Sequence, residues 1–192
     1  MLLLRRLRLP QFLASGDVSH SQLSGREAES SPPTDAGGRA IAFIPKPEQL
    51  PFDESDPDDY RPNSHWALLV DPDRRTGPHV DDITLIVEEI APGDRIPLHT
   101  HPINELIVIL EGRPEVTLGA ETQEVGPGTV VFIAAGTPHG TRNTSTSPVR
   151  IHAMFPSERI GIQYLERNAA PGTESDPPQP AFTIDVRRLA EA

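Results

Sequence analysis

The sequence predicts an all-β protein, a sandwich or barrel built from short strands. Two observations carry this prediction. Between about residues 65 and 166 the apolar segments are short, and glycine, proline or small polar residues separate them at even spacing. No segment in this region repeats its apolar residues every three to four positions, as an amphipathic helix would.

Each expected strand ends at residues typical of turns, such as Pro92-Gly93 and Gly112-Arg113-Pro114. Strands are expected in chain order at 40–44, 65–71, 83–91, 98–101, 105–111, 115–118, 122–125, 130–134, around Thr141, and at 149–155, 160–166 and 182–186.

The length of 192 residues suits one domain with tails. Residues 1–39 contain few large apolar side chains and cannot bury enough surface to offset chain entropy, so a disordered tail is expected. Residues 40–63 are rich in proline and acids and are expected to form an extended arm. The barrel itself is assigned to 64–167, and 168–192 to a short irregular C-terminal extension.

Composition excludes several classes of function. The formal net charge of −11 disfavours binding to nucleic acids or anionic membranes. The absence of cysteine rules out disulfides, thiolate metal ligands and cysteine nucleophiles. No apolar run approaches the roughly 20 residues that span a bilayer. We expect a cytoplasmic protein, although the basic residues 1–10 leave an N-terminal targeting peptide open.

Four residues are candidates for a metal site. His99 and His101 stand two apart on an expected strand, so their imidazoles share a face. Glu105 opens an apolar segment, where an unpaired carboxylate would be costly, and this favours a ligand role. His139 lies in a turn and is either a surface residue or the ligand that closes the cluster from another strand. Three imidazoles and a carboxylate suit one divalent transition metal: Fe, Mn, Ni, Zn or Cu.

The segments around these residues resemble the two signature motifs of the cupin superfamily. The first motif, G-x5-H-x-H-x3,4-E-x6-G, is met at every fixed position by Gly93, His99, His101, Glu105 and Gly112. The second, G-x5-P-x-G-x2-H-x3-N, is met by Gly128, Gly136, His139 and Asn143, with Ala134 in place of the usual proline. That departure concerns a turn residue and not an expected ligand.

The resemblance implies a cupin jelly-roll β-barrel. It also implies that His99, His101, Glu105 and His139 hold one divalent metal. It does not imply a reaction, because this superfamily hosts many chemistries and also proteins that are not enzymes.

Candidates for contact with a small molecule come from the last two strands of the barrel. Arg150 and His152 share one face of the strand 149–155, and a role in the pocket requires this face to point into the barrel. The opposite parity, with the apolar residues of the strand inward, is the ordinary core pattern. Gln163 and Tyr164 are adjacent and lie on opposite faces, so one of the two is expected to face inward.

A homodimer is predicted from the apolar segments Leu85–Val87, Leu106–Leu110 and Val130–Ala135. A strand with one wet face should alternate apolar and polar residues, and these segments do not. The inner face lines the barrel, so the outer face needs either the N-terminal arm or a second subunit as cover.

Together, the motifs and the composition predict a metal-binding protein that acts on a small organic substrate. Iron or manganese would favour a dioxygenase-like oxidoreductase acting on an organic acid or phenol. Zinc or nickel would favour Lewis-acid chemistry, such as that of an isomerase or lyase. A non-catalytic barrel that binds a small molecule is the remaining alternative.

Overall fold

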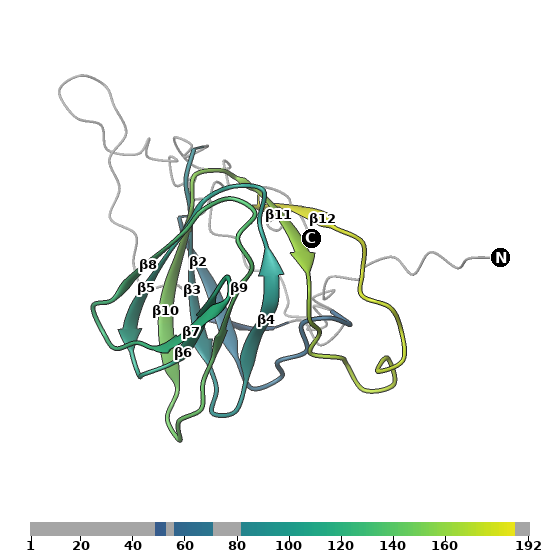
Figure 1. Cartoon of the computed structure of the whole chain (residues 1–192), viewed down its shortest axis with the longest axis horizontal. Helices are drawn as coiled ribbons and strands as arrows, with labels where there is room; N and C mark the ends of the chain where they lie inside the picture. Colours follow the sequence, from purple (N-terminus) through teal and green to yellow (C-terminus); the bar gives the residue numbers. More distant parts are fainter. Residues whose placement is uncertain (1–48, 53–55, 71–81, 187–192) are drawn as a thin grey trace, which may run out of the picture.

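The computed structural model describes residues 49–52, 56–70 and 82–186. The expected tail at 1–39 and the expected strand at 40–44 lie outside the described residues. Within the described part, the chain forms twelve strands arranged in two six-stranded sheets (Figure 1). No helix among the described residues is long and apolar enough to cross a membrane.

The strands follow the predicted segments closely. Their bounds are β1 Leu50–Pro51, β2 His65–Val70, β3 Thr84–Ile90, β4 Arg95–Thr100, β5 Glu105–Glu111, β6 Glu115–Leu118, β7 Glu121–Glu124, β8 Val130–Ile133, β9 His139–Arg142, β10 Val149–Phe155, β11 Arg159–Tyr164 and β12 Phe182–Asp185.

Both sheets bring together strands that are distant in the sequence. One sheet has the order β1-β2-β3-β10-β5-β8, and the other has the order β12-β11-β4-β9-β6-β7. All pairings between neighbouring strands are antiparallel. The two sheets face each other and enclose the core, so the predicted all-β jelly-roll barrel is confirmed.

Strict alternation along β5 and β10 defines the inside of the barrel. In β10 every second residue from Val149 to Phe155 is buried, and in β5 Ile107 and Ile109 are buried in the same way. Val149 and Ile151 of β10 and the two isoleucines of β5 pack together with Ile133 of β8. The barrel is held chiefly by burial of branched apolar side chains, which suit the pleated surface of a strand.

The C-terminal extension assigned to 168–192 contains the strand that was expected at 182–186. Strand β12 pairs with β11, with Ile184 opposite Ile160, so a twelfth strand completes the second sheet. The side chains of Ile184 and Val186 pack against the core. The second sheet therefore continues to Asp185, beyond the bound of residue 167 assigned to the barrel, and the domain bounds stay a prediction.

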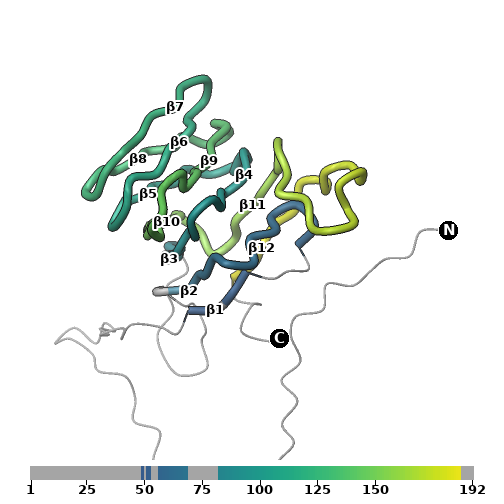
Figure 2. The backbone as a smooth tube through the Cα atoms, turned by 90° about the horizontal axis from the view of Figure 1, so that it is seen from below, coloured from purple at the N-terminus to yellow at the C-terminus, as the bar shows by residue number. Residues whose placement is uncertain are grey.

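The N-terminal arm is fixed against the segment that follows β11 (Figure 2). The amide of Tyr60 donates to the carbonyl of Asn168, at 3.0 Å. The buried carboxylate of Asp58 accepts hydrogen bonds from Arg167 and from the amide of Gln179. The carboxylate of Asp58 in the arm thus satisfies donors of the C-terminal segment and links the two segments.

Two motif residues have structural roles in turns. Asn143 is fully buried, and its amide donates to the carbonyls of Ile90 and Ser147 at 2.9 and 2.8 Å. Gly112 has a φ of +83°, and a Cβ at this position would lie 2.7 Å from Cγ2 of Val149. Glycine is required there both for its backbone conformation and for the close approach of β10.

We predict that Gly112→Ala destabilises the protein by about 2–4 kcal/mol, because left-handed strain adds to a clash with the buried Val149. Gly119→Ala is the matched control: its φ is +61°, but a Cβ would meet no neighbour. The control should lose only about 1 kcal/mol. Urea denaturation measures the free energy of unfolding of both variants. Equal losses would show that the contact with Val149 does not contribute to the cost of Gly112→Ala.

Candidate metal centre

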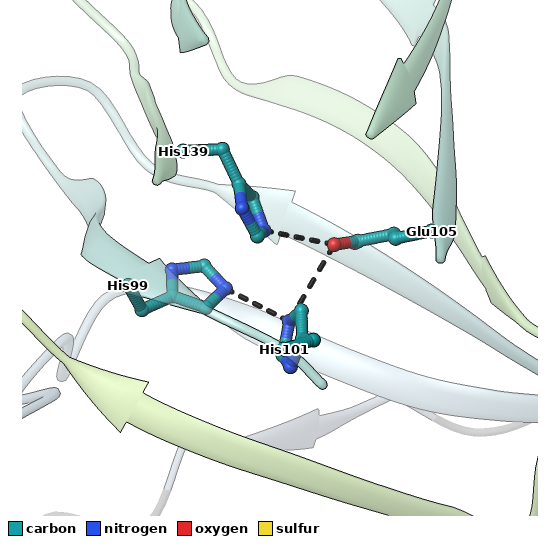
Figure 3. Close-up of side chains that lie close together, drawn as sticks. All are labelled: His99, His101, Glu105 and His139. Carbon is teal, nitrogen blue, oxygen red and sulfur yellow. Dashed lines mark hydrogen bonds and ion pairs between the residues drawn. The ribbon is translucent and has the colours of Figure 1, made fainter. Parts of the chain in front are cut away.

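The four predicted ligand residues converge from three neighbouring segments of the barrel (Figure 3). His99 lies on β4, and His101 follows directly after that strand. Glu105 is the first residue of β5 and His139 the first residue of β9, where it stands opposite His99. All four are buried, and one potential ligand atom from each lies within 4.8 Å of the others.

Backbone carbonyls determine which imidazole nitrogen carries the proton. Each Nδ1 lies within hydrogen-bond distance of a backbone carbonyl oxygen: 2.7 Å to Pro97 for His99, 2.6 Å to Gly161 for His101 and 2.8 Å to Thr137 for His139. A carbonyl oxygen only accepts, so each Nδ1 is the donor. In a neutral imidazole the Nε2 is then a bare lone pair.

Three such lone pairs and a carboxylate oxygen therefore face one another. Nε2 of His99 lies 3.0 Å from Nε2 of His101. Oε2 of Glu105 lies 2.8 Å from Nε2 of His139 and 3.5 Å from that of His101. Although they are close, Oε2 of Glu105 and Nε2 of His139 make no hydrogen bond. A buried polar atom without a partner costs roughly 1–3 kcal/mol.

A divalent cation would satisfy all four atoms at once. Nitrogen and oxygen ligands of this kind suit the borderline metals from manganese to zinc. The three Nδ1–H···O=C bonds are the supporting contacts that orient metal-binding histidines. The residues present therefore fit a metal site, and the donor set does not distinguish among these metals.

Burial also favours the neutral form of His99 and His101. Desolvation lowers the pKa of His99 well below its usual value, and the neighbouring His139 and His101 lower it further. Desolvation likewise lowers the pKa of His101, against the opposing effect of Glu105. Neutral histidine is the form that binds a metal, so these two ligands need not lose a proton first.

The cluster lies on the wall of a cavity of about 240 Å³ inside the barrel. Most of the lining is apolar, including Ile107, Phe155 and Ile162. A concave apolar site with a few polar groups is the usual form of a small-molecule site. The cluster therefore borders a space that a small organic molecule could enter.

One polar region of the cavity was not predicted from the sequence. Asp59 and Arg61 of the arm and Glu88 of β3 line the cavity together. One signal could have pointed to Glu88: Glu88 and Glu89 are adjacent acids in an expected strand, so one of the two faces inward. The pairing of Arg61 with an acid 27 residues away had no local signal.

Of the two adjacent residues on β11, Tyr164 faces inward and Gln163 faces outward. Tyr164 lines the cavity, and its ring centroid lies 6.2 Å from that of His99. Burial raises the pKa of the Tyr164 phenol, so the hydroxyl keeps its proton and can donate a hydrogen bond. Gln163 is exposed and does not line the cavity.

Of the two parities considered for the strand 149–155, the structure has the ordinary core pattern, and Arg150 and His152 lie on the outer face of β10. Arg150 forms ion pairs with Glu111 at 2.8 Å and with Glu89 at 3.1 Å. His152 stands opposite Val87 and Val108, away from the cavity. The physical reason is that the four apolar residues of alternate parity are buried in the core, which forces these two side chains outward.

Comparison with known proteins gives a family and a set of similar structures. The family model described as Cupin domain matches residues 86–155. Among solved structures, the polyketide cyclase RemF from Streptomyces resistomycificus is 27% identical, with a TM-score of 0.49, over 60% of this chain and 80% of that one. The DMSP lyase DddQ from Ruegeria pomeroyi is 28% identical, with a TM-score of 0.44, over 52% and 49%. No curated protein matches the sequence significantly.

The metal-free protein should lose stability as pH falls through about 6.5, the ordinary value for histidine. The pKa values of His99 and His101 are depressed in the fold, so below this pH the unfolded chain binds more protons than the folded one. Thermal unfolding of chelator-treated protein on both sides of this pH measures the loss. His99→Gln/His101→Gln should show a weaker pH dependence, and an unchanged one would contradict the assignment.

Proposed function

Because this chain belongs to the cupin superfamily, we propose that it is a metal-dependent enzyme acting on a small, largely apolar organic substrate. One observation carries the proposal: the buried cluster of three histidines and a glutamate borders an apolar cavity. A purely structural site is closed by its protein ligands, whereas a catalytic site keeps a position for substrate or water.

The protein's own residues would divide the work as follows. His99, His101, Glu105 and His139 would hold a divalent ion, which supplies Lewis-acid or redox chemistry when it is bound. The apolar walls would exclude bulk water and strengthen polar contacts inside the cavity. Glu105 would serve as a ligand and not as the general base, since binding a cation depresses its affinity for a proton.

The reaction class we favour is a dioxygenase-like oxidation with iron or manganese, on a phenol or small organic acid. Zinc or nickel in the same site would instead support an isomerase or lyase. A third alternative is a barrel that binds a small molecule without turnover. All three alternatives use the same metal site. Only the oxidation consumes oxygen, and only the binding barrel leaves the bound molecule unchanged.

The test begins with elemental analysis of protein purified without chelator. We expect close to one divalent transition metal per chain, because a single cluster of four ligands is present among the described residues. Oxygen uptake is then measured against a panel of phenols and small organic acids, with product analysis for turnover that consumes no oxygen.

The control for this test is His99→Ala/His101→Ala. The double variant should lose both metal and any activity, because two of four ligands are removed. A double variant that binds as much metal as the parent would show that the site is misassigned. A metal-loaded parent that converts no compound by either readout would favour the binding barrel.

We also propose that the protein is a homodimer, formed through the outer face of the sheet that contains β8. Val130 and Phe132 of β8 are each 58% exposed. Their cross-strand neighbours are Val108 and Leu106, which extend the apolar surface onto β5. Exposed apolar side chains on an edge strand favour contact with another chain.

Light scattering at micromolar concentration should give twice the chain mass of 21.0 kDa. Phe132→Glu should shift the protein toward the mass of one chain, because a charge would then be buried in the contact. Gln123→Glu, an exposed position on β7, is the control and should leave the mass unchanged. A parent protein with the mass of a single chain would refute the dimer.

A further inference from the structure

Glu88 is an acidic residue of the cavity that the metal cluster does not use. It lies on β3, lines the cavity and has a side chain that is only 14% exposed. Its cross-strand neighbours on the same face are Trp66 and Ile151, both largely apolar. Oε2 accepts a hydrogen bond from Arg61 at 2.9 Å, whereas Oε1 accepts none from the described part of the chain.

The positive charge of Arg61 is already balanced by another acid. Nε and Nη2 of Arg61 each donate to a carboxylate oxygen of Asp59, both at 2.7 Å. The ring of Phe52 covers the guanidinium, with the ring centroid 3.6 Å from Cζ. This two-pronged pairing is the strong form of an arginine–carboxylate contact. The three charged groups together therefore carry one surplus negative charge, which falls to Glu88.

The surroundings of Glu88 favour an exchangeable proton. Desolvation has the largest effect on the pKa of Glu88 and raises it. The charge of Arg61 lowers this pKa, and the charges of Asp59 and Glu105 raise it further. The remaining titratable groups of the cavity are Asp56, Tyr164 and the three imidazoles of the metal cluster. A carboxyl group whose pKa is raised in a water-poor site is suited to accept and return a proton.

This inference rests on the proposed function. We infer that Glu88 is the proton acceptor of the cavity, and that the preferred ligand is an uncharged, largely apolar molecule with an acidic O–H group, such as a phenol or enol. On binding, the O–H bond of the ligand breaks and its electron pair stays on the ligand oxygen. The proton forms a new O–H bond on the Glu88 carboxylate.

This transfer keeps the charge of the cavity constant. The negative charge moves from Glu88 to the ligand oxygen, and no net charge enters the low-dielectric interior. A ligand that arrives as an anion would place a second negative charge near Glu88, and like charges at close range disfavour joint ionisation. Binding of such an anion would therefore require Glu88 to take up a proton from the solvent.

The test counts protons by calorimetry in two buffers of different ionisation enthalpy. Zinc-loaded protein is titrated with catechol as the uncharged probe and with benzoate as the anionic probe, at a mildly alkaline pH, which favours the carboxylate form of Glu88. With catechol, Glu88→Gln should release about one proton more per bound probe than the parent. With benzoate, the parent should take up about one proton more than Glu88→Gln.

The matched control is Glu89→Gln, the next residue on the same strand. It removes one negative charge from the outer face, where Glu89 pairs with Arg150, and should exchange protons as the parent does. In Glu88→Gln the amide oxygen can still accept the hydrogen bond from Arg61, so the arm keeps its contact. Equal proton counts in the parent and Glu88→Gln would overturn the inference.

A second measurement needs no variant. The infrared difference spectrum of the zinc-loaded parent with and without catechol should gain a band of a protonated carboxyl group, and absence of the band would overturn the inference. The two proposals fail separately. A parent that binds no zinc refutes the proposed function and this inference with it. A parent that binds zinc and catechol without protonating a carboxyl group refutes this inference alone.

Discussion

The structure depends on one arrangement: four unprotonated acceptor atoms that face a common point in the interior. Backbone carbonyls hold the Nδ1 protons of three histidines, so their Nε2 lone pairs point at one another and at the carboxylate of Glu105. Without a cation this arrangement is repulsive and leaves buried atoms unpaired. The pairing of β4 with β9 and the short turn before β5 bring these atoms together and prevent them from turning away.

The same barrel places two polar regions around one apolar cavity. The histidine cluster is ready to accept a cation, and the Glu88 region holds a surplus negative charge that Arg61 and Asp59 keep in place. The arm that supplies Arg61 is itself fixed by contacts with the segment between β11 and β12. The contacts that fix the arm therefore also keep Arg61 in place beside Glu88.

Local patterns predicted the strands and the four candidate ligands, because turn residues, period-two spacing and motif spacing act over a few residues. The face of β10 was not decidable locally: either parity of Val149–Phe155 was plausible, and core packing decided it. The Arg61–Glu88 pair and the closure by β12 join segments far apart in the sequence. Such contacts arise from the topology of the sheets and leave no periodic signal in the sequence.

The central claim is that this cluster is a metal site, and the most direct measurement is thermal unfolding of metal-free protein titrated with zinc. A cation that binds only the folded state raises the melting temperature, with a stabilisation that grows with the ratio of free metal to dissociation constant. We expect zinc to raise the melting temperature clearly, and to its full extent only when all four ligands are present. The rise should be smaller in Glu105→Gln. An unchanged melting temperature at saturating zinc would contradict it.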